Sequence, residues 1–142
     1  MSAIFGIVME GVRVAAGQPA KGIRKILGDL GERLAVQHLL AKGYEILERN
    51  FRTREGEIDI VAQRGGVLAF VEVRSRRGTS MGGALESLSD AKQQRMVRLA
   101  EAYAQARADL PSQHRIDVIA VDFSAERRLK SLRHLENCVW AV

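Results

Sequence analysis

Several kinds of residue are scarce in this chain, and each scarcity excludes a class of protein. The single cysteine, Cys138, cannot form an internal disulfide, which excludes a disulfide-rich scaffold and favours a reducing compartment. With one cysteine and three scattered histidines, the spacing of a zinc finger is missing as well. Aromatic residues make up only 5% of the chain, which argues against a surface that stacks on the bases of single-stranded nucleic acid.

A long hydrophobic run is also missing. The first apolar stretch, residues 3–9, is seven residues long, whereas a membrane-spanning helix needs about 20. No basic residue precedes this stretch, although a signal peptide would need a positively charged start. We therefore expect a cytoplasmic protein without a membrane partner.

What the chain does contain is the composition of one globular domain. Hydrophobic residues make up 46% of its 142 residues, which suffices for one core and leaves too little chain for a second. Its net charge of +5 would suit a nucleic acid or another anionic surface. Many proteins with neither partner carry a similar charge, so the charge alone decides nothing.

The first 27 residues differ from the rest. They mix apolar residues with four glycines and show no clean period. We predict that residues 1–27 form an N-terminal extension that need not be ordered, and that residues 28–142 form the folded domain.

The remaining chain alternates between helical and extended patterns. Apolar residues recur at helical spacing in residues 29–42 and 90–108, with Gly43 as a C-terminal cap and Ser89 as an N-terminal cap. Strand patterns cover residues 44–51, 57–63, 67–75, 116–122 and 132–139. The order αβββαββ predicts an α/β fold, in which a mixed β-sheet is flanked by helices.

Two predicted strands carry acidic residues within apolar runs. Asp59 interrupts the second strand, and Glu72 interrupts the third, with Arg74 on the same face of that strand. A hairpin between the two strands would bring Asp59 close to Glu72. Two neighbouring carboxylates are costly to bury, and Mg²⁺ would compensate them while leaving room for a phosphate oxygen. Alternatively, Arg74 forms a structural salt bridge with either carboxylate.

A longer, ordered set of motifs resembles a known family. The set includes Gly31-Glu32, Gly56-Glu57-Ile58-Asp59 and Val71-Glu72-Val73-Arg74, together with segments 43–44, 47–52 and 115–120. It resembles the PD-(D/E)XK nuclease superfamily and, more closely, the YraN-like bacterial family within it. The resemblance extends from about residue 27 to about residue 140.

This resemblance implies a restriction-endonuclease-like fold, akin to that of Holliday junction resolvases. It implies a metal-dependent endonuclease that hydrolyses phosphodiester bonds in branched or repair-related DNA. Asp59 and Glu72 would hold Mg²⁺ or Mn²⁺. Glu32 would add a carboxylate, unless it is merely an exposed helix residue. The analogy with resolvases, which act on symmetric junctions, also suggests a homodimer.

Arg74 departs from the superfamily, which has lysine at this position. Arginine stays protonated, so Arg74 cannot act as a general base, although it could bind phosphate or stabilise charge in the transition state. Lys92 is a candidate substitute for the missing lysine, and Gln93 could orient water. Both would also be unremarkable as solvated helix residues.

Basic residues are concentrated between residues 74 and 98, where six of them face only two acidic residues. This excess would suit a phosphate backbone, unless the segment is simply a solvated loop. The predicted contacts with nucleic acid are Arg76, Arg77, Lys92, Gln93 and Arg95. Asp117 interrupts the fourth strand, and we expect it to pair with an arginine rather than to bind the metal.

The sequence is therefore compatible with three functions. The favoured one is a nuclease. The second is a module of nuclease fold that binds nucleic acid without cutting it, for which Arg74 is the main argument. The third is a protein-interaction domain whose acidic pair is a relic held by salt bridges.

Overall fold

The computed structural model describes residues 20–78 and 87–140. Its elements are α2 (Ala20–Ala41), β1 (Glu45–Thr53), β2 (Gly56–Arg64), β3 (Val67–Arg77), α3 (Asp90–Ala106), β4 (His114–Phe123) and β5 (Leu129–Leu135). The predicted α/β class and the order αβββαββ are confirmed, and they are consistent with a restriction-endonuclease-like fold. None of the described residues form a helix that is long and apolar enough to cross a membrane.

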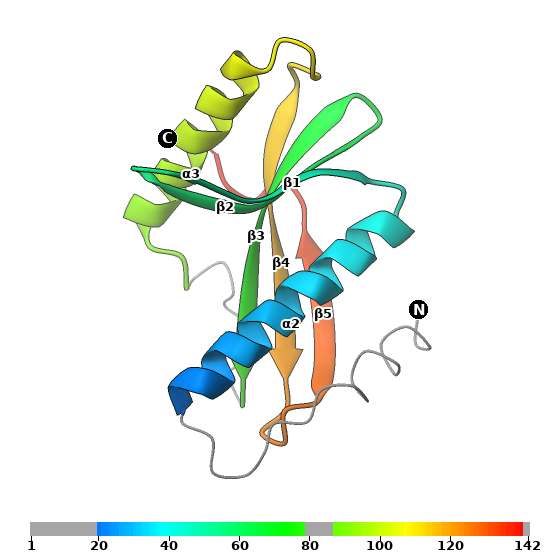
Figure 1. The fold of residues 1–142 in the computed structure, drawn as a ribbon, viewed down its shortest axis with the longest axis vertical. Coiled ribbons are helices and arrows are strands. Elements are labelled where there is room, and N and C mark those ends of the chain that lie inside the picture. Colours follow the sequence, from blue (N-terminus) through cyan, green and yellow to red (C-terminus); the bar gives the residue numbers. More distant parts are fainter. Residues whose placement is uncertain (1–19, 79–86, 141–142) are drawn as a thin grey trace.

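One five-stranded sheet forms the centre of the molecule (Figure 1). Its strands follow the chain order, β1 to β5, and all neighbours are antiparallel except β3 and β4. A parallel pair requires a crossover connection, which α3 provides. The tight turn between β2 and β3 is possible because Gly65 and Gly66 both adopt positive φ angles, of 58° and 77°.

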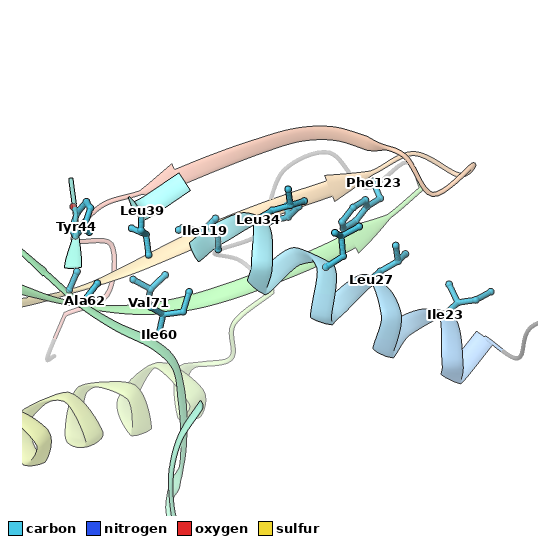
Figure 2. Close-up of a cluster of buried hydrophobic side chains, with 14 residues drawn as sticks. Ile23, Leu27, Leu34, Leu39, Tyr44, Ile60, Ala62, Val71, Ile119 and Phe123 are labelled. Carbon is cyan, nitrogen blue, oxygen red and sulfur yellow. The ribbon is translucent and has the colours of Figure 1, made fainter. Parts of the chain in front are cut away.

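The two helices cover opposite faces of the sheet. Helix α2 packs on alternate residues of the strands, such as Val71 and Ile119. Together these residues form one hydrophobic core (Figure 2). Helix α3 packs on the intervening residues, such as Phe70 and Val118, in a second core. This alternation is the expected result of strand geometry, because successive side chains point to opposite faces.

Helix α2 begins nine residues before the predicted start at residue 29. Ile23 and Leu27 lie within the predicted extension, yet both are buried in the core against the sheet (Figure 2). Gly22 and Gly28 interrupt the apolar period and lower helix propensity, but packing of the apolar stripe outweighs that cost. The rest of the extension, residues 1–19, lies outside the described residues.

The other boundaries differ less from the predictions. Ser89 caps α3 as predicted, accepting a hydrogen bond from Lys92 N at 3.1 Å, and the apolar residues that recur at helical spacing in α3 are buried, among them Met96, Leu99 and Tyr103. Strand β5 ends at Leu135 rather than at residue 139, because the chain turns at Asn137, whose φ is +50°. Val139 still reaches the core, which explains why the apolar pattern continued beyond the strand.

The sheet divides where β2 and β3 separate, and we call this point the fork. Ile60 and Val71 form the last paired positions of β2 and β3. Beyond them, β2 continues beside β1 alone and β3 beside β4 alone. The next residues in the diverging strands are Asp59 and Glu72, so the fork carries both acidic residues that interrupt the apolar runs.

Candidate active site

The fork brings the carboxyl groups of Asp59 and Glu72 together. Val73 N donates a hydrogen bond of 2.8 Å to Asp59 Oδ2. The aspartate side chain therefore satisfies a backbone N–H group of β3 just beyond the point where β2 and β3 stop pairing. Glu72 is only 4% exposed, and its carboxyl group lies beside that of Asp59. Burial, followed by the negative charge of Glu72, raises the pKa of Asp59 to about 7.

Glu32 adds a third negative charge near the fork, from helix α2. Its charge contributes to the raised pKa of Asp59, and burial raises its own pKa although Arg49 opposes that shift. The Oε1 atom of Glu32 is buried without a hydrogen-bond partner among the described residues. Glu32 is therefore not the freely solvated helix residue that the sequence left open.

A glycine precedes Glu32 because α2 approaches β3 very closely there. A Cβ atom on Gly31 would lie 1.9 Å from Ser75 Oγ and 3.3 Å from Ser75 Cβ. Any side chain at position 31 would force either the serine or the helix to move. The Gly31-Glu32 motif thus combines a close helix–strand contact with the carboxylate that follows it.

Two cations contact the acidic pair, both through Glu72. Arg74 Nη1 lies 3.5 Å from Glu72 Oε2, and Lys92 Nζ lies 3.3 Å from the same oxygen. The salt bridge considered for Arg74 therefore exists, and Lys92 reaches the same carboxylate from the first turn of α3. A lysine is present beside the acidic pair, although a helix supplies it instead of β3.

The other residues predicted to bind nucleic acid occupy different surroundings. Gln93 Nε2 donates a hydrogen bond of 3.1 Å to Leu88 O, so this amide group braces the start of α3. Arg95 lines a hollow beside Lys92, between α3 and the β1–β2 turn. Arg76 and Arg77 line a separate hollow against α2. The glycine-rich part of the basic loop, residues 79–86, lies outside the described residues.

The donor set at the fork restricts which metal it could hold. Within residues 20–78 and 87–140, no three His, Cys, Asp or Glu side chains converge in a way that could hold a metal ion. Protein ligands would therefore number two, Asp59 and Glu72, and water or phosphate would complete the coordination shell. Mg²⁺ is commonly bound in this way, whereas Zn²⁺ requires three or four protein ligands. A carboxyl group whose pKa is raised by burial and by Glu72, as that of Asp59 is, fits such a cation, with Glu32 adding charge near it.

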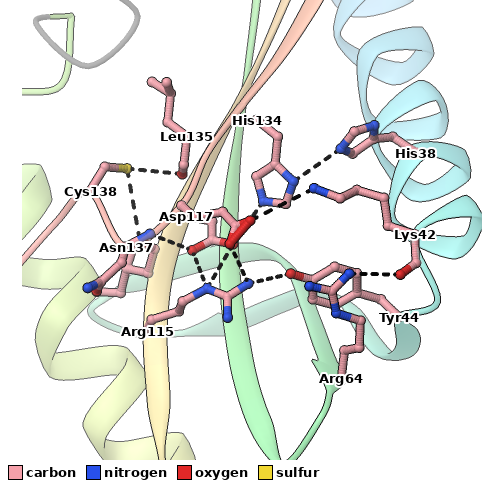
Figure 3. A network of polar contacts seen from close by, with 12 residues as sticks. His38, Lys42, Tyr44, Arg64, Arg115, Asp117, His134, Leu135, Asn137 and Cys138 are labelled. Atoms are coloured by element: carbon pink, nitrogen blue, oxygen red, sulfur yellow. Dashed lines mark hydrogen bonds and ion pairs between the residues drawn. The ribbon is translucent and has the colours of Figure 1, made fainter.

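Asp117 lies on the other face of the sheet, where it forms the centre of a polar network (Figure 3). It is fully buried, and Arg115 Nε donates to Oδ1 at 3.0 Å while His134 Nε2 donates to Oδ2 at 2.8 Å. Asn137 N donates to Oδ1 at 2.9 Å. Burial alone would raise the pKa of Asp117, but these hydrogen bonds together lower it. The predicted pairing with an arginine is confirmed.

This network extends further than the sequence analysis anticipated. Arg115 also donates to the hydroxyl group of Tyr44, and His38 Nε2 lies 3.1 Å from His134 Nδ1 (Figure 3). Burial and the charge of His134 lower the pKa of His38 to about 4, so His38 is neutral. The network joins the end of α2 to β4 and β5. Its members are too far apart in the sequence to form a motif.

Comparison with known proteins places the chain in a family. The model of the uncharacterised protein family UPF0102 matches residues 31–121. A UPF0102 protein of Roseiflexus castenholzii is 46% identical over 120 residues, which cover 83% of this chain and 96% of that protein. One of Pelotomaculum thermopropionicum is 46% identical over 114 residues, which cover 80% and 95%. The chain belongs to family UPF0102, the YraN-like family that its motifs resemble.

Proposed function

We propose that this protein is a metal-dependent endonuclease that hydrolyses phosphodiester bonds in DNA. The observation that carries the proposal is the acidic pair at the fork, half-buried Asp59 beside buried Glu72, with Lys92 and Arg74 against Glu72. A purely structural aspartate would be expected to have its charge compensated, as that of Asp117 is, whereas both cations at the fork form their ion pairs with Glu72 and not with Asp59. A carboxyl group whose pKa is shifted by burial and by a neighbouring charge is typical of functional sites.

The proposed cofactor is Mg²⁺ or Mn²⁺, held by Asp59 and Glu72. When bound, such an ion polarises a phosphate oxygen and lowers the pKa of a water molecule. Asp59 keeps its orientation through the hydrogen bond from Val73 N, so the carboxylate is fixed before the ion arrives. Glu32 holds negative charge close to Asp59 without being a direct ligand.

The two cations take different parts in the proposed reaction. Arg74 stays protonated and is suited to contact a phosphate oxygen and stabilise the charge that develops on it. Lys92 carries a compact ammonium group with three donors, so it is suited to orient the attacking water. Its Nζ atom lies 3.3 Å from Glu72 Oε2, which would keep it close to a metal that Glu72 held. Lys92 thus takes the place of the lysine that β3 lacks.

The proposed substrate is branched or repair-related DNA, and a homodimer would match the symmetry of a four-way junction. Support for the substrate comes from the family resemblance and from basic residues on both sides of the fork. Arg95 lies beside Lys92 at one hollow, and Arg76 and Arg77 lie at the other. Phosphate contacts from such residues position a strand without selecting its sequence.

The test is a cleavage assay on branched, flapped and linear DNA with Mg²⁺ and with Mn²⁺. We expect wild-type protein to cut at least one substrate and Asp59→Asn to cut none, because the metal loses a charged ligand. Asp109→Asn is the matched control, since Asp109 is exposed and pairs with Arg107 just beyond the end of α3. It should cut as wild type does.

A second candidate function is DNA binding without cleavage. It is favoured by the salt bridge between Arg74 and Glu72, which occupies a ligand oxygen with a permanent cation. Salt-dependent binding of DNA without cutting under either metal would establish this candidate in place of the nuclease. If the protein binds neither metal nor DNA, a protein-interaction domain becomes the better interpretation.

A further inference from the structure

A second basic hollow lies away from the acidic pair, between α2 and the end of β3. Six described residues line it: Ile23, Arg24, Leu27, Ser75, Arg76 and Arg77. Its volume is about 430 Å³, which falls within the range of ordinary ligand-binding pockets. Four of these six residues, Ile23, Arg24, Leu27 and Ser75, are not among the site residues predicted from the sequence.

The charge of this hollow has one sign. Three of its six lining residues are arginines, and none is acidic. Among the described residues, neither Arg24 nor Arg77 has an ion pair with a carboxylate, and both side chains are exposed. Uncompensated guanidinium groups on two elements can bind one phosphate from two sides, because each offers a planar pair of donors.

The floor of the hollow is apolar. Ile23 and Leu27 are buried there, at 6% and 5% exposure, one turn apart on α2. A cationic rim above an aliphatic floor suits a ligand that alternates phosphate with less polar sugar. The backbone of a nucleic acid has this composition.

The position of the hollow relates it to the fork. Arg76 and Arg77 lie four and five residues beyond Glu72 on the same strand. At about 3.3 Å per residue, this separation is roughly 15 Å. DNA advances about 3.4 Å per base pair, so the distance corresponds to about four or five base pairs.

We propose that this hollow binds the phosphate backbone of the same DNA about four or five base pairs from the fork, with Arg24 and Arg77 on either side of one phosphate. The proposal rests on the proposed function only in requiring that DNA reaches the fork. Backbone binding needs no cleavage, so the two can fail separately. The hollow would hold the duplex in place while the acidic pair acts on a distant bond.

The test measures DNA binding by the full chain in EDTA, where a metal-dependent nuclease cannot cut. Affinity for a fluorescent duplex is recorded over a series of salt concentrations for wild type and for Arg24→Gln. Glutamine keeps the length and helix propensity of the side chain while removing its charge. Arg33→Gln is the matched control, because Arg33 is exposed on the same helix, nine residues on and therefore on the opposite side.

We expect Arg24→Gln to weaken binding on the order of tenfold at low salt, the loss expected for one charge-assisted phosphate contact. The slope of log K against log salt should flatten by about 0.9, and Arg33→Gln should leave both quantities unchanged.

Three results would overturn the proposal. Equal effects of Arg24→Gln and Arg33→Gln, or no effect of either, would leave DNA binding intact but place it elsewhere. A loss of binding to inorganic phosphate with unchanged binding to DNA would make the hollow a small-anion site. Absence of DNA binding by wild-type protein would overturn this proposal and the nuclease together.

Discussion

Asp117 and Asp59 lie on opposite faces of the sheet, the first fully buried and the second half-buried, and their surroundings differ in how well they compensate the charge. Asp117 accepts hydrogen bonds from Arg115, His134 and Asn137, and its pKa lies below the ordinary value. Asp59 accepts one backbone hydrogen bond and faces a second carboxylate, and its pKa rises to about 7. Both cations at the fork contact Glu72, so Asp59 carries most of the electrostatic cost.

This difference separates a carboxylate that stabilises the fold, Asp117, from one that we propose binds a metal, Asp59. A buried charge with enough partners stabilises the fold. If it is removed, its partners are left buried and uncompensated, and the fold loses stability. A buried charge with too few partners weakens the fold and is tolerated where function requires it. The comparison can therefore be tested by removing each carboxylate in turn, since the effects on stability should have opposite signs.

The largest expected effect follows from Asp117→Ala. Removing this carboxylate takes away the acceptor that Arg115 and His134 share, and the His134 side chain is only 4% exposed. We expect a loss of about 3–5 kcal/mol in the free energy of unfolding, measured by urea denaturation at pH 7. Asp109→Ala, which removes an exposed partner of Arg107, should leave the urea midpoint nearly unchanged. Equal losses in the two variants would contradict the role given to the network.

Asp59→Asn should act in the opposite direction. Asparagine can still accept the hydrogen bond from Val73 N, while the repulsion from Glu72 disappears. We expect a gain of about 2–4 kcal/mol in the free energy of unfolding at pH 8, since each unit of pKa shift corresponds to about 1.4 kcal/mol. Metal-dependent cleavage should be lost in the same variant. A less stable Asp59→Asn protein would show that the charge of Asp59 is compensated after all.

The pH dependence of stability should reflect the same contrast in the metal-free protein. The folded pKa of Asp59 is about 7 and its ordinary value is 3.8, so the folded state binds more protons between these limits. Stability should therefore fall as pH rises from about 4 to about 7. Asp117 has a lowered pKa and acts in the opposite sense, its contribution being lost only as pH falls below about 3.8.

Urea denaturation at several pH values in EDTA, for wild type and Asp59→Asn, measures this dependence. The variant should show a flatter profile between pH 4 and pH 7 than wild type. Added Mg²⁺ should restore stability to wild type at pH 8, because the ion binds the folded state alone. Identical profiles for the two proteins would show that Asp59 titrates normally.

Local patterns were enough to predict the order of the elements and the acidic pair. Asp59 and Glu72 stand out because a charge within an apolar strand is rare, and strand pairing then brings the two together. The start of α2 was missed because Gly22 and Gly28 interrupt a stripe whose residues pack well in three dimensions. Propensity is a local quantity, whereas burial of Ile23 depends on the whole sheet.

The Asp117 network could be predicted only in part for a related reason. Arg115 lies two residues from Asp117 on the same strand, so the sequence suggests that pair. Tyr44, His38 and His134 come from other elements, and only the folded sheet places them in contact. The same holds for Arg24, which approaches Arg77 through the packing of α2 on β3.

The smallest expected effect on stability concerns the two cations at the fork. Arg74→Lys should change the free energy of unfolding by less than about 0.5 kcal/mol, since a cation remains beside Glu72. If Lys92 supplies the function of the missing lysine, Arg74→Lys should raise cleavage only a few-fold, whereas Lys92→Gln should lower it about 100-fold or more. The two variants should be compared in magnesium-dependent cleavage of one DNA, with thermal unfolding as the check on folding.

Strong cleavage by Lys92→Gln, together with a large gain in Arg74→Lys, would return the catalytic position to β3. A folded Arg74→Lys protein that binds DNA but does not cut it would favour the binding module, because the fork would then hold both lysines and still lack activity.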